Sequence, residues 1–238
     1  MKTHQAIWVM LLLLAVLWKG CEKENTEIQP DEHPDQEVLP PDTLPVEGWI
    51  TGMVSETGFD EEAYQTTVSI NRIPHTLDKF LELRDQIAYT PQGAVAMMIV
   101  AFRIYQQYPV EGMKCLTANS TYPLIGPAPN NPGAYDGNAM NNTTTLRQRL
   151  SELSYLPFIY YMGASPQNGY TPDAPPYQVE MYTNPHSYIE SNDGTMRIKL
   201  FVKTQGADSA RPVTVRKTGG FYSITEYSSL YLSPKPPH

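Results

Sequence analysis

The chain has 238 residues, and its hydrophobic share of 41% is enough for one domain with its own core. The net charge of −8 is uneven: residues 22–49 hold nine acids against one base, whereas residues 50–238 hold 16 acids and 14 bases. Nucleic-acid binding needs clustered positive charge, so this nearly neutral folded region argues against a nucleic-acid partner.

The first twenty residues have the organisation of an export signal. Lys2 supplies a positive charge, and residues 6–18 form an unbroken apolar run. A helix needs about 20 such residues to span a bilayer, so this run has the length of a signal-peptide core. Gly20 then places a small residue directly before Cys21.

This segment resembles bacterial lipoprotein signal peptides, in which cleavage occurs before a cysteine that receives a lipid. Gly20 and Cys21 fit that pattern, whereas Trp18 and Lys19 depart from it. The resemblance implies an exported protein with a lipid (palmitate among its acyl chains) on Cys21. It would be anchored to the bacterial outer membrane, on the periplasmic side or at the cell surface.

Two other interpretations stay open: an ordinary cleaved signal peptide with an incidental cysteine, and an uncleaved anchor helix. Residues 22–49 favour the lipoprotein, because an acidic segment with five prolines cannot bury enough apolar surface to fold. The expected organisation has three parts: a signal peptide over 1–20, the lipidated Cys21 with an acidic, proline-rich tether over 21–49, and a single globular α+β domain over 50–238.

Helix signals dominate the first half of the folded region. Thr76 suits the cap of a helix over residues 77–89, and Thr90 followed by Pro91 starts a second helix. Residues 94–102 are apolar on all sides, which predicts a buried helix.

That second helix is expected to end at Pro109. Residues 117–143, rich in Asn, Pro, Gly and Thr, indicate a long loop. Thr144 or Thr145 then suits the cap of a third helix, which Pro157 kinks or ends.

Strand signals dominate the second half. Residues 196–203 alternate between apolar and polar, and strands over 211–217 and 221–231 follow, joined by a glycine hairpin. With residues 178–183 they make an antiparallel meander. The expected fold class is α+β, with the helices of the first half packed on one face of this C-terminal sheet.

Several stretches resemble a bacterial family of uncharacterised cell-envelope domains. They are residues 90–93, 163–172, 176–177, 206–216, 220–222 and 226–230. The resemblance covers roughly residues 76–237 and implies a shared fold, with no activity attached. The order of elements is also similar to cone-shaped folds of the nuclear-transport-factor-2 type, which implies a pocket between a curved sheet and a helix.

The residue patterns indicate no catalytic group, cofactor or metal. His75 and His186 lack metal-ligand spacing, and Ser165 lacks the flanking glycine of a nucleophile elbow. The adjacent acids at 61–62 are typical of a solvated surface. Cys115 has no intramolecular partner if Cys21 is lipidated, and we expect it to be a small buried residue.

Two polar clusters have both a structural and a functional interpretation. Asp208, Ser209 and Arg211 share a turn. Either Asp208 and Ser209 bond to the turn backbone while Arg211 pairs with a carboxylate, or the three form a polar recognition loop. The second cluster is a basic strand face, which is either a solvated sheet surface or a site for an anion such as an acidic sugar or a phosphate. Its residues are Arg197, Lys199 and Lys203, joined by Arg216.

Six tyrosines fall in or beside expected loops, where they either fill the edge of the core or recognise a sugar or protein. They are Tyr160, Tyr161, Tyr170, Tyr177, Tyr182 and Tyr188.

The leading functional hypothesis is a lipid-anchored cell-envelope binding or interaction module without catalysis. Its expected partners are the membrane, through the lipid on Cys21, and a glycan or an envelope protein. The alternatives are an extracytoplasmic hydrolase-like enzyme with a pocket between helix and sheet, and a structural component of an envelope complex.

Overall fold

The computed structural model describes residues 39–191 and 194–238, and within them the chain has the expected α+β fold. The helices are α2 (Leu77–Ile87), α3 (Pro91–Gln107), α4 (Pro109–Ala118) and α5 (Thr144–Glu152). The strands of the main sheet are β1 (Gly48–Val54), β2 (Tyr64–Ile70), β5 (Tyr177–Tyr182), β6 (Tyr188–Glu190), β7 (Met196–Val202), β8 (Arg211–Thr218) and β9 (Phe221–Glu226). A separate small hairpin joins β3 (Ile125–Pro127) to β4 (Asn138–Met140).

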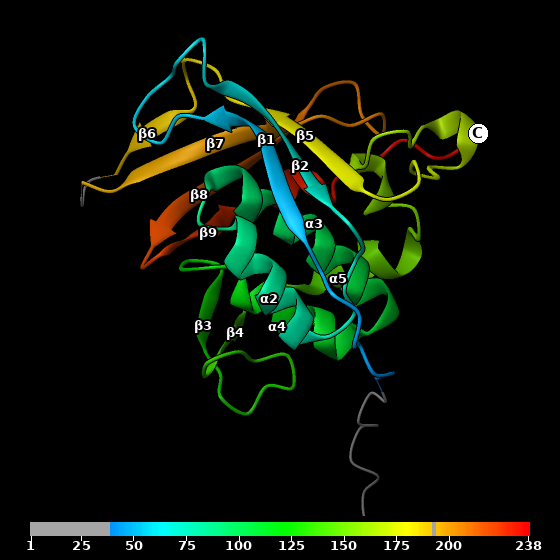
Figure 1. The fold of residues 1–238 in the computed structure, drawn as a ribbon. Coiled ribbons are helices and arrows are strands. Elements are labelled where there is room, and N and C mark those ends of the chain that lie inside the picture. Colours follow the sequence, from blue (N-terminus) through cyan, green and yellow to red (C-terminus); the bar gives the residue numbers. More distant parts are fainter. Residues whose placement is uncertain (1–38, 192–193) are drawn as a thin grey trace, which may run out of the picture. The chain divides into compact units, whose positions relative to one another are not determined.

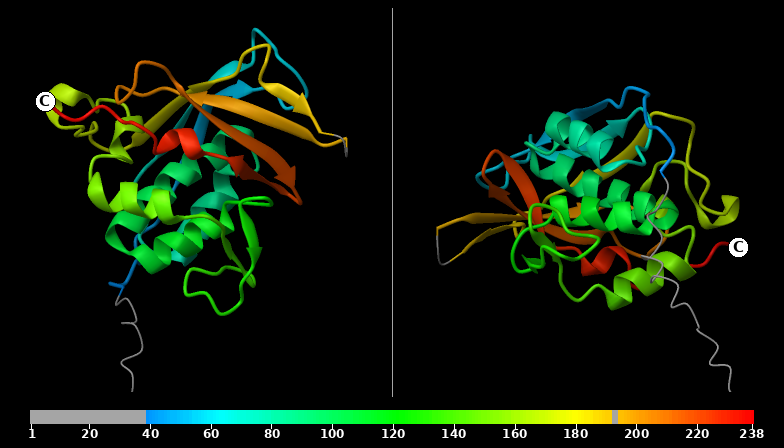
Figure 2. Two further views of the ribbon diagram at one scale, coloured as in Figure 1. Left: turned by 180° about the vertical axis from the view of Figure 1, so that it is seen from behind. Right: turned by 90° about the horizontal axis from the view of Figure 1, so that it is seen from below.

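The main sheet is antiparallel throughout and runs in the order β1-β2-β5-β7-β8-β9, with β6 also paired to β7. Figures 1 and 2 show the sheet arching over the helices, which gather on one side of it. The expected C-terminal meander is therefore confirmed in β7, β8 and β9, and the helices lie on one face of the sheet. No helix of residues 39–191 or 194–238 lies on the other face (Figures 1 and 2).

The local signals at the starts of α2 and α3 are confirmed, whereas the expected cap of the third helix at Thr144 or Thr145 is wrong: α5 begins at Thr144, and Thr143 before it makes no capping hydrogen bond with its side chain. The side chains of Thr76 and Thr90 cap α2 and α3 by accepting hydrogen bonds from the backbone amides of Lys79 and Gly93, respectively. Such caps satisfy amides that have no partner inside the helix. The first twelve residues of α3 are all buried, so this helix is the centre of the core.

Pro109 ends α3 as expected, but it also begins α4, which the sequence analysis did not predict. Proline suits the first turn of a helix, because the amide it lacks would have no helical partner there. Gly112 lets α4 approach α3: a Cβ atom at this position would lie 2.2 Å from the Cα atom of Tyr105.

The expected order of helices first and strands afterwards is wrong, because β1 and β2 precede α2. Threonine and serine fill much of β2, which weakened its apolar signal. The expected loop over residues 117–143 contains the end of α4 and the β3–β4 hairpin. The last strand ends at Glu226 rather than at Tyr231, because a short 3-10 turn over Ser228–Leu230 follows it.

The folded part also begins before residue 50. Residues 39–47 lie within the described chain, and strand β1 starts at Gly48. The side chain of Asp42 is only 2% exposed, so this acid belongs to the folded domain rather than to a solvated tether.

Candidate functional site

The face of the sheet without helices carries a hollow of about 510 Å³ between β6, β7, β8, β9 and the segment after α4. We call it the basic hollow. Its lining residues are Tyr122, Pro123, Ile189, Ser191, Arg197, Lys199, Thr214, Arg216, Thr225 and Glu226. Its volume lies within the range of about 300–1,000 Å³ that is usual for small-molecule sites.

Strand alternation explains why the basic residues gather there. Ile198, Leu200 and Val202 of β7 are fully buried against the core. Successive side chains of a strand point to opposite faces, so Arg197 and Lys199 point away from the helices. The alternation of the sequence predicts this shared face, and the structure confirms it for Arg197, Lys199 and Arg216.

Arg197 of β7 stands directly opposite Arg216 of β8 in the strand register. Like charges in this position are unfavourable, by roughly 0.2–1 kcal/mol. The Nε atoms of both arginines are buried, and within residues 39–191 and 194–238 neither has a hydrogen-bond partner. The pair therefore holds unused, desolvated donors at the base of the hollow.

The wall beside this pair comes from the chain after α4. The backbone of Ser120 and Thr121 pairs with Ile224 at the edge of β9, through a hydrogen bond of 3.0 Å from the Thr121 amide to the Ile224 carbonyl. This pairing brings Thr121 Oγ1 to 3.3 Å from Arg216 Nη2, which donates to it. It also places Tyr122, whose side chain is 72% exposed, over the hollow.

Tyr122 and Glu226 are two of the lining residues that could not be found from the sequence. Tyr122 lies in a stretch interpreted as a loop, and its pairing with β9 is a contact between residues about a hundred positions apart. A β-bulge between Thr214 and Val215 shifts the register against β9 and helps to bring Glu226 to the rim. Neither contact has a local signal in the sequence.

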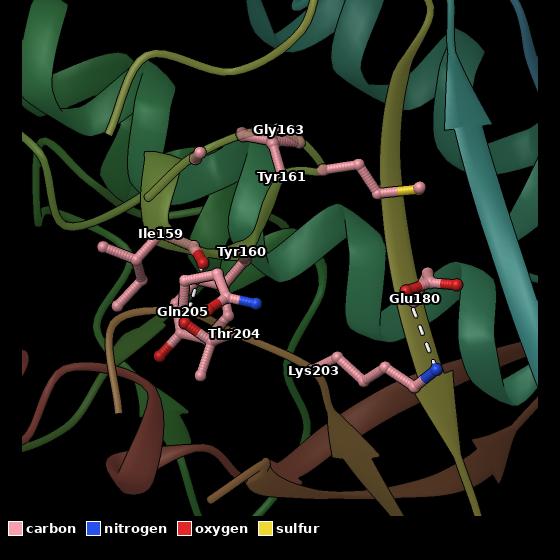
Figure 3. A pocket seen from close by; sticks show the side chains of 10 residues that line it. Ile159, Tyr160, Tyr161, Gly163, Glu180, Lys203, Thr204 and Gln205 are labelled. Carbon is pink, nitrogen blue, oxygen red and sulfur yellow. Dashed lines mark hydrogen bonds and ion pairs between the residues drawn. The ribbon is translucent and has the colours of Figure 1, made fainter. Parts of the chain in front are cut away.

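Lys203 does not join the basic hollow. Its Nζ lies 3.7 Å from Glu180 Oε2, beside a smaller cavity of about 190 Å³. Figure 3 shows this cavity, where Lys203 reaches towards Glu180 and Thr204 bonds to Ile159. The charge of Lys203 is thus paired, whereas among residues 39–191 and 194–238 no ion pair forms with Arg197 or Arg216.

The six singled-out tyrosines mostly belong to the packed structure. Tyr160, Tyr161 and Tyr170 are buried in the core. The hydroxyl of Tyr160 donates to the Leu230 carbonyl and that of Tyr170 to the Lys235 carbonyl. The hydroxyl of the half-buried Tyr188 donates to Ser55 O at 2.9 Å. The interpretation as core filling holds for the three buried rings, whereas Tyr182 lies half-buried on the outer face.

The turn after β7 binds the C-terminal segment through an ion pair and hydrogen bonds. Asp208 forms an ion pair of 2.5 Å with Lys235, and the guanidinium of Arg211 donates to the carbonyls of Leu232 and Ser233. The hydrogen bond from Lys235 lowers the pKa of the Asp208 carboxyl. The expected carboxylate partner of Arg211 is therefore wrong, since backbone oxygens take that place.

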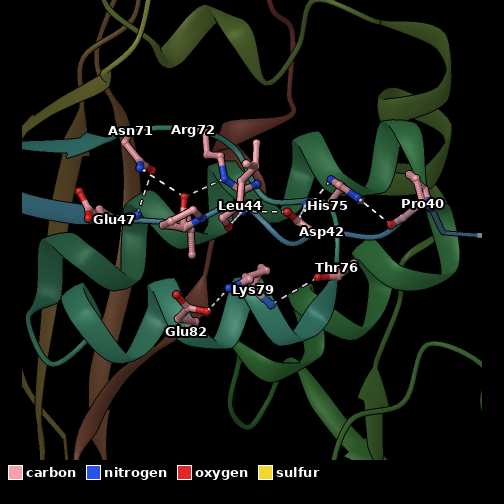
Figure 4. A network of polar contacts seen from close by, with 12 residues as sticks. Pro40, Asp42, Leu44, Glu47, Asn71, Arg72, His75, Thr76, Lys79 and Glu82 are labelled. Carbon is pink, nitrogen blue, oxygen red and sulfur yellow. Dashed lines mark hydrogen bonds and ion pairs between the residues drawn. The ribbon is translucent and has the colours of Figure 1, made fainter.

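His75 belongs to a second polar site, which we call the N-terminal clamp: Asp42, Arg72 and His75 (Figure 4). Asp42 Oδ1 lies 2.7 Å from Arg72 Nη2, and Asp42 Oδ2 accepts a 2.9 Å hydrogen bond from the His75 amide. The His75 ring lies 3.3 Å from the same carboxylate and 3.0 Å from the Pro40 carbonyl. The clamp fixes the chain just before β1 to the loop before α2.

The carboxyl of Asp42 has a lowered pKa. Burial is the largest influence and disfavours the charged form. The His75 amide and the Arg72 guanidinium act in the opposite direction and together outweigh it. Asp42 is therefore a structural anion whose charge the clamp satisfies.

The other candidates have ordinary surroundings. His186 lies in the turn before β6, Ser165 precedes a short 3-10 turn, and Cys115 is fully buried as expected. Burial raises the pKa of the Cys115 thiol, which disfavours the reactive thiolate. Cys21 lies outside the described residues.

In the part of the chain that the structure describes, no group of three or more His, Cys, Asp or Glu residues is placed to hold a metal ion. No helix of those residues is long and apolar enough to cross a membrane.

Comparison with known proteins gives one result. Searches among curated proteins and among solved structures found no match. Residues 72–238 match a family described as a domain of unknown function, DUF6935, which covers α2 to the C-terminus and all the basic residues of the hollow. The chain thus belongs to the DUF6935 family.

Proposed function

We propose that this protein is a lipid-anchored binding module of the cell envelope, which takes up an anionic ligand in the basic hollow without transforming it. One observation carries the proposal: Arg197 and Arg216 face each other, and their buried Nε donors have no partner in the part of the chain that the structure describes. Guanidinium groups donate in a planar fork that matches carboxylate and phosphate oxygens. A bound anion would relieve their repulsion and satisfy their donors together.

The surroundings of the arginine pair support binding rather than catalysis. Lys199 adds a third positive charge, and hydroxyls of Thr214 and Thr225 line the same wall. A general base or nucleophile would need an activating partner, and neither threonine has a histidine beside it in the lining. The arrangement suits recognition of a charged group by several hydrogen bonds.

The test is a titration of the full chain with inorganic phosphate and with citrate, followed by NMR of the arginine Nε–H signals. We expect the Arg197 and Arg216 signals to move together and to saturate. Replacing Arg216 by Gln should weaken binding at least tenfold, because a charge-assisted hydrogen bond contributes about 1.5–3 kcal/mol.

The matched control is Arg149→Gln, which removes the same charge from the exposed face of α5, where Arg149 lies 3.9 Å from Glu152. This variant should bind as the unchanged protein does. Equal weakening in both variants would mean that the anions respond only to net charge, and the hollow would not be a site.

The anchor is a separate part of the proposal and rests on the sequence before residue 22. Its test is Cys21→Ala: we expect the unchanged protein to sediment with membranes and to incorporate labelled palmitate, and the variant to do neither. A variant that still partitions into membranes with the label would contradict lipidation at Cys21.

The proposal also includes a cone-shaped fold similar to the nuclear-transport-factor-2 type. Two contacts that join distant strands support this curvature: the Tyr188 hydroxyl reaches Ser55, and the Tyr222 hydroxyl donates to Glu56 at 2.8 Å. Both connect the β1–β2 tip to the opposite side of the sheet. An experimental structure whose sheet is flat between β1 and β9 would contradict this part.

A further inference from the structure

We infer that the ligand of the basic hollow is an acidic oligosaccharide, bound by a sugar carboxylate between Arg197 and Arg216 and by aromatic contacts along the outer face of the sheet. The inference rests on the proposed function and names its ligand class. It follows from what surrounds the two arginines.

The charges around the hollow favour a ligand with few anionic groups. Glu226 lines the same hollow as the arginines, and its Oε1 accepts hydrogen bonds from the amide and hydroxyl of Ser228, of 2.7 and 2.5 Å. A ligand with negative charge along its whole length, such as polyphosphate, would meet this carboxylate with repulsion. A ligand that carries one anionic group among several hydroxyls suits both the arginine pair and Glu226, because its anionic group accepts hydrogen bonds from the arginines and its hydroxyls donate to the carboxylate.

The exposed ring of Tyr122 forms an aromatic wall beside Pro123 in the lining of the hollow. An aromatic ring has a flat apolar face with one polar end, which suits the C–H face of a sugar ring next to its hydroxyls. Phosphate has no apolar face and would gain nothing from this contact.

Phe201 lies on the same face of β7 as Arg197 and four residues further on, roughly 13 Å at about 3.3 Å per residue. Its ring stacks on that of Tyr182 from β5, with 5.4 Å between centroids and 20° between planes. Lys199 lies between this stacked pair and the arginines. Aromatic surfaces therefore flank the basic group, which favours a chain of sugars over one sugar.

The experiment titrates the full chain with a panel of acidic oligosaccharides: oligogalacturonate, oligomannuronate and sialyllactose. Inorganic phosphate and a neutral oligosaccharide of equal length are the comparison ligands. We expect one acidic oligosaccharide to bind at least tenfold more tightly than phosphate, and the neutral one to bind at least tenfold more weakly than its acidic counterpart.

Two pairs of variants locate the contacts. Arg216→Gln should weaken the acidic oligosaccharide at least tenfold, whereas Arg149→Gln should leave it unchanged. Tyr122→Leu should weaken it several-fold without altering phosphate binding, and Tyr122→Phe should retain it. This last pair separates loss of the flat ring from loss of the hydroxyl.

The outcomes separate the two proposals. Phosphate binding that depends on Arg216, with no acidic oligosaccharide binding more tightly, would overturn the oligosaccharide inference and leave the anion-binding function in place. Equal binding by Tyr122→Leu and the unchanged protein would also overturn the inference. If neither phosphate, citrate nor any acidic sugar moves the Arg197 and Arg216 signals, both proposals are wrong.

Discussion

The N-terminal clamp and the basic hollow both contain arginine at the edge of a packed domain, but the surroundings of the charge differ. In the clamp, Arg72 pairs with Asp42 and also donates to the backbone carbonyls of Leu44 and Pro45. In the hollow, Arg216 has Thr121 at 3.3 Å and a second arginine across the strand.

The difference indicates which charges serve the fold and which are available to a ligand. A buried charge with a full set of partners stabilises the native state, and removing one partner leaves the other uncompensated. Two like charges that face each other across a strand pair lower the stability of the native state. Stability measurements on the two sites should therefore give changes of opposite sign.

The largest effect is expected in the clamp. Replacing Asp42 by Asn should lower the free energy of unfolding by about 2 kcal/mol, because the Arg72 guanidinium and the His75 amide lose a charged acceptor that is only 2% exposed. The measurement is urea unfolding followed by circular dichroism.

Asp85→Asn is the matched control for this substitution. Asp85 is 58% exposed and lies 3.4 Å from Arg84, so water screens that pair and its removal should change stability by less than about 0.5 kcal/mol. Similar losses in the two variants would mean that the clamp is no more important than a surface ion pair.

The contribution of Asp42 should also depend on pH. Its pKa is lower in the folded protein than the ordinary value of 3.8, so its stabilisation is fully present above that value. It is lost as the pH falls through the folded-state pKa, because protonation removes the charge that Arg72 and His75 hold. The stability difference between the unchanged protein and Asp42→Asn should therefore shrink in acid as the pH falls below 3.8. A difference that grows on acidification would contradict this role.

Much of the fold follows from local sequence signals. The threonine caps at 76 and 90, the all-apolar run in α3 and the alternation in β7 each follow from the nearest neighbours, and each is confirmed. Strands β1 and β2 were missed although they pair with each other as a hairpin, because threonine and serine weaken the apolar pattern of β2. The other partner of β2 is β5, more than a hundred residues away. Pairing between distant segments leaves no local pattern.

The candidate site also has some features that follow from local sequence patterns and others that depend on contacts between distant segments. Arg197, Lys199 and Arg216 could be placed on one face from alternation alone, whereas Lys203 shares that face and yet pairs with Glu180. Which cation stays unpaired depends on the neighbouring strand, and Glu180 comes from β5. Tyr122 reaches the hollow only through the pairing of its segment with β9. Sequence reasoning thus found the charge of the site, but the aromatic wall needed the tertiary structure.

The smallest expected effect lies in the hollow and has the opposite sign. Without an anion, Arg216→Gln should raise the free energy of unfolding by about 0.5 kcal/mol, because it relieves the repulsion with Arg197. Arg72→Gln, the same substitution in the clamp, should lower it by about 1.5 kcal/mol. The measurement is urea unfolding of both variants and the unchanged protein in a low-salt buffer free of polyvalent anions.

Adding phosphate should then make the unchanged protein more stable than Arg216→Gln. A ligand that binds only the native state stabilises it by RT ln(1 + [L]/Kd), so phosphate should stabilise the unchanged protein, which binds it more tightly, more than Arg216→Gln. The advantage of the variant would disappear once the ligand fills the site. If Arg216→Gln instead loses stability in both buffers, the guanidinium is part of the fold, and the contrast between the hollow and the clamp is wrong.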